Sequence, residues 1–142
     1  MFLGEFNHTI DTKGRLIIPA KFRNQLGERF VITRGMDQCL AGYPLSEWEK
    51  LQTKLAALPM TKKNVRQFVR FLYSAALECE FDKQGRINLS PTLMKYAGLS
   101  QQSVIVGVAA HFEIWEPAAW EKYSQQAEDN FADVAENLDF DF

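Results

Sequence analysis

The sequence predicts an α+β protein in which two tandem repeats form one closed or nearly closed β-barrel, decorated by helices. The pattern Asp-x-x-Gly-Arg occurs twice, at 11–15 and 82–86, with an offset of 71 residues. Short apolar runs flank both motifs, which is typical of β-strands. A unit of roughly 45 residues is too small to bury a stable core by itself. We therefore expect the two copies to complete each other around a pseudo-two-fold axis.

The repeat extends well beyond the motif. The offset of 71 continues as far as Gly27 and Gly98, and the tripeptide Trp-Glu-Lys recurs at an offset of 72, beginning at Trp48 and Trp120. The predicted organisation is a first repeat over 5–47, a helical connection over 48–75, a second repeat over 76–119, and a C-terminal helix with an acidic tail over 120–142.

Both copies show the same order of elements. A first strand (5–10; 77–81) leads into the Asp-x-x-Gly turn, in which glycine supplies a positive φ and aspartate accepts hydrogen bonds from turn amides. The strands predicted after the turns cover 15–18, 30–33 and 39–43 in the first copy, and 86–89, 103–108 and 112–115 in the second.

A short helix follows the second strand of each copy. Ser90 is a good N-cap with Pro91 at the first helical position, whereas Pro19 starts the equivalent helix without a polar cap. Both helices are expected to stop at a glycine, Gly27 or Gly98.

Three longer helices are also predicted. Ser46 and Glu49 have the spacing of a capping box, a helix over 62–76 links the copies, and Pro117 opens the last helix. Their apolar stripes consist of Trp48, Leu51, Leu55 and Leu58; of Val65, Phe68, Val69 and Leu72; and of Trp120, Tyr123 and Ala127.

Charge is unevenly distributed along the chain. The net charge is −2, but residues 128–142 carry six acidic side chains and no lysine or arginine. The remaining 127 residues therefore hold 16 basic and 12 acidic residues, a net charge of +4. A mildly basic body with an acidic tail is compatible with nucleic-acid binding. The tail is either a solvated end or a docking peptide dotted with Phe131, Phe140 and Phe142.

Several protein classes are not expected. The chain has no apolar run of about 18 residues, the length that a membrane-spanning helix needs. Its N-terminus lacks the pattern of a signal peptide. Cys39 and Cys79 are the two cysteines, which favours a reducing cytosol over a disulfide framework or a metal site.

These residues resemble the MraZ family, whose halves are similar to the SpoVT-AbrB type of DNA-binding domain. The resemblance rests on the paired Asp-x-x-x-Arg motifs and covers nearly the whole chain. Supporting segments are Met1-Phe2-x-Gly-Glu at the start, Lys13-Gly14-Arg15-Leu16 with Ile18-Pro19 following, and Gly42-Tyr43-Pro44 before Trp48.

The resemblance implies a swapped-hairpin β-barrel and a transcriptional regulator of the cytoplasm that associates with the nucleoid. It also implies a ring-shaped homo-oligomer that binds short direct repeats in double-stranded DNA upstream of the cell-division and cell-wall gene cluster. No cofactor, metal, membrane or small-molecule substrate is expected.

The expected DNA-binding residues lie in and after the two turns. They are Thr12, Lys13, Gly14, Arg15, Lys21, Arg23, Lys83 and Arg86. Arg15 has the geometry for a bidentate bond to guanine, while Lys13 with Lys21 or Arg23 suits flanking phosphates. Asp11, Gly14, Asp82 and Gly85 are expected to shape the turns. The first copy is favoured for base reading, because the second departs from it at Asn88 and Ser90.

Alternatives stay open at this point. Each Asp and Arg could form a salt bridge that only stabilises its hairpin. The basic group of Lys62, Lys63, Arg66 and Arg70 is a solvated helix face, a phosphate contact or a site for an acidic partner.

Two other functional classes are compatible with parts of the sequence. The paired Asp residues also resemble the dyad of aspartic proteases, but an Arg four residues on should keep each of them ionised. His8 and His111 stand alone and favour no catalytic site. A protein-interaction hub of the antitoxin type is the stronger rival.

Overall fold

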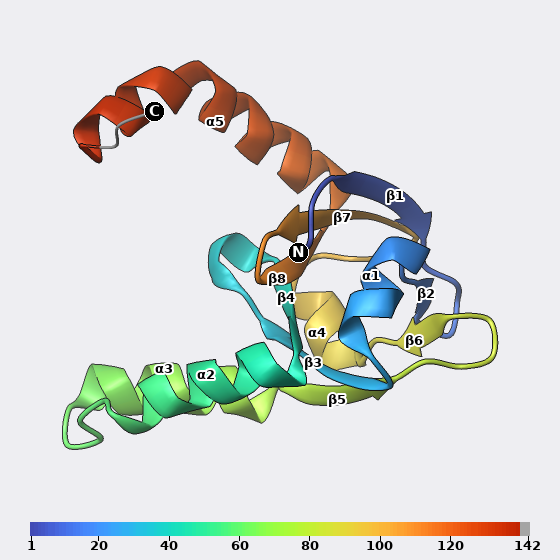
Figure 1. Ribbon diagram of the computed structural model, residues 1–142, viewed down its shortest axis with the longest axis horizontal. Helices are drawn as coiled ribbons and strands as arrows, with labels where there is room; N and C mark the ends of the chain where they lie inside the picture. Colours follow the sequence, from blue (N-terminus) through green and yellow to red (C-terminus); the bar gives the residue numbers. More distant parts are fainter. Residues whose placement is uncertain (140–142) are drawn as a thin grey trace.

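The computed structural model describes residues 1–139, which form a six-stranded antiparallel sheet, a two-stranded ribbon and surrounding helices (Figure 1). The strands are β1 (Glu5–Thr9), β2 (Arg15–Ile17), β3 (Arg29–Arg34), β4 (Leu40–Pro44), β5 (Leu77–Glu80), β6 (Arg86–Asn88), β7 (Gln102–Val108) and β8 (His111–Trp115). The helices are α1 (Ala20–Leu26), the 3-10 turn η1 (Met36–Gln38), α2 (Leu45–Ala56), α3 (Lys63–Ser74), α4 (Pro91–Tyr96) and α5 (Pro117–Asn137). The α+β class is thus confirmed.

The sheet joins the two copies in a symmetric order. The strands run β1-β7-β8-β4-β3-β5, and exchanging equivalent strands of the copies simply reverses that order. At the centre, Ala41 of β4 lies opposite Glu113 of β8, which is its equivalent at the offset of 72. The pseudo-two-fold axis predicted from the repeat therefore passes between β4 and β8.

The same axis passes through the ribbon of β2 and β6. Leu16 pairs with Ile87, its own equivalent at the offset of 71, with Arg15 opposite Asn88 and Ile17 opposite Arg86. Both central side chains are buried, with exposed fractions of 0% for Leu16 and 2% for Ile87. Because side chains alternate between the two faces of a strand, the other four residues face outward.

The prediction of a closed barrel is wrong for the described residues. The sheet is open, with β1 and β5 at its two edges, and the ribbon stands apart from it. One bridge, between Ile10 and Leu16, continues the β1 ladder toward β2 before the strands diverge. Beyond this bridge β2 pairs with β6, so the ribbon lies over the core and does not complete the sheet.

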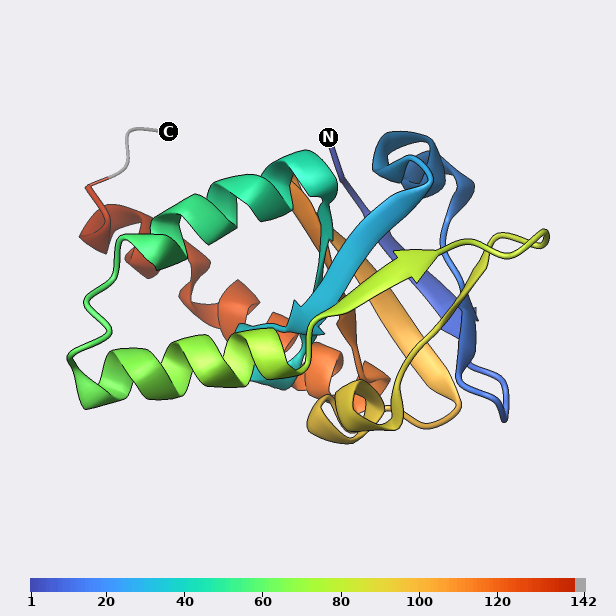
Figure 2. The same cartoon turned by 90° about the horizontal axis from the view of Figure 1, so that it is seen from below.

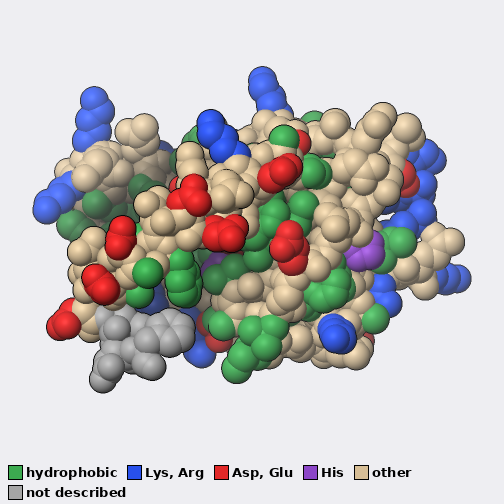
Figure 3. All heavy atoms as spheres, turned by 90° about the horizontal axis from the view of Figure 1, so that it is seen from above, with side chains coloured by type: hydrophobic (Ala, Val, Ile, Leu, Met, Phe, Trp, Pro, Cys, Tyr) green, Lys and Arg blue, Asp and Glu red, His purple; other side chains and the backbone are tan. Residues whose placement is uncertain are grey.

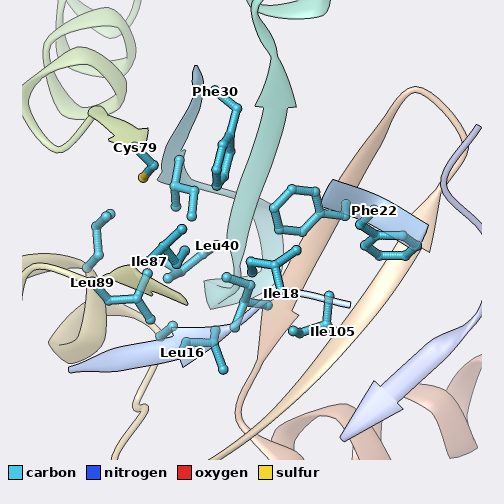
Figure 4. Packing of buried hydrophobic residues seen from close by; sticks show 14 of the residues in the cluster. Leu16, Ile18, Phe22, Phe30, Leu40, Cys79, Ile87, Leu89 and Ile105 are labelled. Carbon is cyan, nitrogen blue, oxygen red and sulfur yellow. The ribbon is translucent and has the colours of Figure 1, made fainter. Parts of the chain in front are cut away.

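The core is shared by both copies (Figure 4). Phe22 of α1, Phe30 of β3 and Phe112 of β8 are essentially inaccessible to solvent, and the rings of Phe22 and Phe112 lie 5.8 Å apart. A Cβ on Gly42 would overlap the Phe112 ring, so the glycine of β4 makes room for that ring. Side chains of each copy thus bury side chains of the other in one common core, as the small size of a single repeat predicts.

The short helices agree with their predicted caps. Ser90 Oγ accepts a hydrogen bond from Leu93 N at 3.2 Å, and Pro19 precedes α1 without a side-chain cap. Gly27 and Gly98 follow the two helices with φ values of 72° and 65°. The copy that lacks a polar cap therefore relies on tertiary packing to hold its helix.

Two features of the longer helices differ from the prediction. The capping box at Ser46 is wrong, because α2 begins at Leu45, directly after strand β4, and Ser46 already lies inside the helix. Leu58 lies beyond the end of α2 and is 38% exposed, and Phe68 of α3 is 39% exposed. Trp48, at the start of α2, and Leu72, near the end of α3, are buried where the helices meet the sheet, and Leu55 is buried in the last turn of α2.

The helices α2, α3 and α5 extend from the sheet at one end of the molecule, opposite the ribbon and its turns (Figures 1 and 2). No helix within residues 1–139 has the length and apolarity that crossing a membrane would require. Cys39 and Cys79 are free and buried. The predictions that involve Phe140, Asp141 and Phe142 concern residues outside those that the structure describes.

Candidate nucleic-acid interface

The two Asp-x-x-Gly-Arg turns have the same hydrogen bonds. In the first, Asp11 Oδ1 accepts from Lys13 N and Arg15 N, both at 2.9 Å, and Oδ2 accepts from Arg15 Nε at 2.6 Å. In the second, Asp82 Oδ1 accepts from Gln84 N and Arg86 N at 2.9 Å, and Oδ2 accepts from Arg86 Nε at 2.7 Å. One carboxylate therefore holds both the backbone and the arginine of its turn.

These bonds keep the aspartates ionised. Hydrogen bonds from the backbone of Arg15 and Arg86 lower the pKa of Asp11 and Asp82, and the arginine side chains lower the pKa further. Two carboxyls with lowered pKa values, each paired with its own arginine, do not share a proton as a protease dyad does. The geometry thus supports the turn-shaping role rather than acid–base chemistry.

Each arginine donates to its aspartate through Nε, and its two terminal Nη atoms take no part in that salt bridge. Within residues 1–139, no hydrogen bond joins the Nη atoms of Arg15 or Arg86 to the protein. Their side chains are 34% and 26% exposed. A stabilising salt bridge and a DNA contact are therefore compatible in this motif. The Nε bond can orient the guanidinium while the two Nη atoms remain available to a ligand.

The ribbon brings the two arginines together on one surface. Arg15 lies opposite Asn88, so Arg86 is its diagonal neighbour across the strands, at roughly 7–8 Å by the usual sheet geometry. Ile17, 42% exposed, and Asn88 lie on the same outward face. These two residues were not among those predicted from the sequence. The alternation of side chains along a strand indicates them, because each lies two residues after an arginine, with a buried residue between.

The family is decided by comparison with known proteins. The family model described as "MraZ protein, putative antitoxin-like" matches the chain twice, over residues 1–71 and 72–141. The chain belongs to the MraZ family.

Close relatives agree with this over their whole length. A protein of Ligilactobacillus salivarius named "Transcriptional regulator MraZ" is 61% identical over 142 residues, which is 99% of each chain. A protein with the same name from Limosilactobacillus reuteri is 59% identical, and the match covers 100% of both chains. Another, from Lactobacillus delbrueckii subsp. bulgaricus, is also 59% identical, and the match covers 98% of this chain and 97% of the relative.

In this MraZ-family chain, the predicted residues gather at one end. Thr12, Lys13 and Lys83 are exposed in the turns, and Lys21 is exposed on α1. Gly14 and Gly85 are buried with φ values of 78° and 76°. Figure 3 shows lysine and arginine side chains at the end that carries the ribbon and turns, and others at the opposite end and along the upper edge of the view.

Arg23 plays a different part from the other predicted residues. It is half-buried, and its Nη1 donates a hydrogen bond to Ile18 O at 3.0 Å. A Cβ on Gly85 would overlap its guanidinium. Arg23 thus spans from α1 of the first copy to the turn of the second. Its charge adds to burial in lowering the pKa of His8 on β1.

The second basic group lies far from the turns, on α3. Arg66 Nη1 donates hydrogen bonds to Met60 O and Thr61 O, at 3.1 and 3.0 Å, which fastens the loop between α2 and α3. Lys62, Lys63 and Arg70 are exposed. This group is therefore not part of the surface formed by the ribbon and turns.

Proposed function

We propose that the chain is a sequence-specific DNA-binding transcriptional regulator that contacts double-stranded DNA through the β2–β6 ribbon and its two flanking turns. One observation carries the proposal: Arg15 and Arg86 lie diagonally on the outward face of a two-stranded ribbon, each fixed through Nε by its own aspartate. The major groove of B-DNA admits a two-stranded ribbon, and a bidentate arginine on guanine is the commonest specific contact. The names of the relatives accord with this role.

The side chains around the arginines suit the rest of the interface. Lys13 and Lys83 in the turns suit phosphate oxygens, which set position without reading sequence. Asn88 can offer both a donor and an acceptor to a base edge. Ile17 presents an apolar surface of the kind that contacts a thymine methyl group. The residues missed by sequence reasoning therefore add plausible base contacts.

A binding experiment tests the arginines. Arg15→Ala and Arg86→Ala should each weaken binding to the promoter site by about 1–3 kcal/mol and relax the preference for that site over a scrambled one. Arg70→Ala on α3 is the matched control, since it removes an exposed arginine at the opposite end. Equal losses for Arg70→Ala, or unchanged affinity and preference for both ribbon variants, would contradict the proposal.

We further propose, from the family resemblance, that the functional unit is a ring-shaped homo-oligomer of swapped-hairpin subunits at the nucleoid. Its site would be a set of short direct repeats upstream of the cell-division and cell-wall gene cluster. Several subunits on tandem repeats gain effective concentration, so affinity should rise with repeat number. Titration of DNA with one, two and three repeats measures this, and equal affinities would argue against a ring.

A protein-binding role is the second candidate, and α5 favours it. Tyr123, Val134 and Leu138 are spaced along one side of the helix with exposed fractions of 41%, 49% and 71%. The matching family model carries an antitoxin-like description. Salt separates the candidates, because DNA binding weakens steeply as salt rises through counterion release, whereas binding through an apolar stripe does not.

A further inference from the structure

We propose that Ile17 and Asn88 make the DNA site of this chain non-palindromic, because they read different bases beside two equivalent arginines. This inference rests on the proposed function. Phosphate contacts carry no sequence information, and the phosphates are alike on both flanks of a site. A surface built from two equivalent copies can therefore distinguish the two halves of its site only through unlike side chains that reach base edges.

The backbone of the ribbon is alike in both copies. Its ladder continues at the two ends through equivalent hydrogen bonds, from Ile18 N to Gly85 O at 3.3 Å and from Leu89 N to Gly14 O at 2.9 Å. The two arginines are held by the same Nε bonds to aspartate, at 2.6 and 2.7 Å. Rotation about the pseudo-two-fold axis thus exchanges one arginine with the other and retains the arrangement of the backbone.

The other two outward side chains of the ribbon break this symmetry. Ile17 and Asn88 occupy equivalent positions at the offset of 71. The register places Asn88 directly opposite Arg15, and Ile17 directly opposite Arg86. Directly opposed side chains lie roughly 4.5–5.5 Å apart at Cβ, which is between one and two base steps of about 3.4 Å. Each end of the ribbon therefore carries an arginine with a different neighbour.

At the Arg15 end the neighbour is an amide that is available to a base. A Cβ on Gly14 would lie 3.4 Å from Asn88 Oδ1, so the amide lies beside the turn that carries Arg15. Asn88 is exposed, and within residues 1–139 its side chain makes no hydrogen bond to the protein. An asparagine amide can bond to both N6 and N7 of adenine. This end consequently suits a guanine with an adenine close to it.

At the Arg86 end the neighbour is apolar. Ile17 is 42% exposed and has no polar group for a base edge. Apolar side chains contact the C5-methyl group of thymine. This end consequently suits a guanine with a thymine close to it. A palindromic site would present the same base to Ile17 and to Asn88, so the preferred site has unlike halves and the chain lies on it in one direction.

The cations around the ribbon do not supply this distinction. The turns differ in sequence, but each carries one lysine, Lys13 or Lys83. The short helices also carry exposed lysines on both sides, Lys21 on α1 and Lys95 on α4. These side chains suit phosphates, so they contribute to affinity in either direction.

Selection from a library of random duplex DNA by the full-length chain tests the inference. The wild type should enrich a motif with guanine in both halves and unlike bases beside the two guanines. Asn88→Ile should make the motif palindromic and reduce the preference for adenine by about tenfold, because it removes the amide. Ile17→Asn should also make it palindromic, with adenine in both halves. Both positions are exposed, so neither change disturbs the core.

Two exchange variants complete the test. Ile17→Asn with Asn88→Ile should restore a motif with unlike halves, which separates this effect from a general loss of specificity. The matched control exchanges the exposed turn residues instead and should keep the wild-type motif. Its changes are Thr12→Lys, Lys13→Gln, Lys83→Thr and Gln84→Lys.

The outcomes distinguish the inference from the function on which it rests. A palindromic motif for the wild type, or unlike halves retained in both single variants, would overturn the assignment of Ile17 and Asn88. A palindromic motif for the turn exchange would overturn it as well, because the turns would then read the bases. Failure of the wild type to enrich any motif would instead overturn the proposed function itself.

Discussion

The guanidinium of Arg23 in α1 lies against the α-carbon of Gly85, in the turn of the other copy, and leaves no room there for a side chain. Two requirements thus meet at Gly85, a φ of 76° and a close approach by Arg23. Gly98 also has a positive φ, of 65°, but a Cβ there would have nothing within 4 Å. Comparing these two glycines distinguishes the cost of a positive φ from the cost of displacing Arg23.

Gly85→Ala should therefore cost more than Gly98→Ala. The positive φ alone should lower the free energy of unfolding by about 1–2 kcal/mol in each variant. Gly85→Ala must also displace Arg23, so its loss should be larger, and combining it with Arg23→Ala should recover the excess. Urea denaturation of the single and double variants measures this coupling. Equal losses for the two glycines would show that Arg23 yields without cost.

The turn lysines should act on the salt dependence of DNA binding rather than on sequence preference. Lys13→Ala and Lys83→Ala should each reduce the slope of log affinity against log salt by about 1, because each removes a phosphate contact. Affinity measured at several salt concentrations, on the cognate and a scrambled site, checks both parts. A changed site preference with an unchanged slope would move these lysines from phosphates to bases.

The aspartates of the turns predict a loss of stability in acid. Their pKa is lowered in the folded state from the ordinary value of 3.8. The stabilisation is therefore fully present above the unfolded pKa, and it is lost as pH falls through the folded pKa. The urea midpoint should drop over that acidic range. Asp11→Asn with Asp82→Asn should flatten the drop, whereas the control Asp129→Asn on α5 should preserve it.

Two serines test the assignment of helix caps. Ser90→Ala should destabilise the protein by about 1 kcal/mol, since Ser90 Oγ accepts the hydrogen bond from Leu93 N. Ser46→Ala should be close to neutral, because α2 begins before Ser46 and no side-chain cap is present there. Thermal unfolding of the two variants side by side suffices. A loss at Ser46 comparable to that at Ser90 would restore the predicted capping box.

Much of the site followed from the repeat. Equivalent residues on a duplicated chain predict equivalent turns, and the bonds of Asp11 and Asp82 are indeed the same. Alternation around Leu16 and Ile87 predicts the outward face of the ribbon. Ser46 failed as a cap because a local spacing rule ignores the preceding strand, which continues directly into α2.

The duplication, the order of strands and helices, and the chemistry of the two turns follow from the residues alone, because these depend on local pattern and backbone preference. The open sheet, the pairing of β2 with β6 and the contact of Arg23 with Gly85 of the other copy come from the three-dimensional fold. These are contacts between residues distant in the chain, and they depend on how two cores merge into one. Local periodicity carries no information about which copy a strand or an arginine will meet.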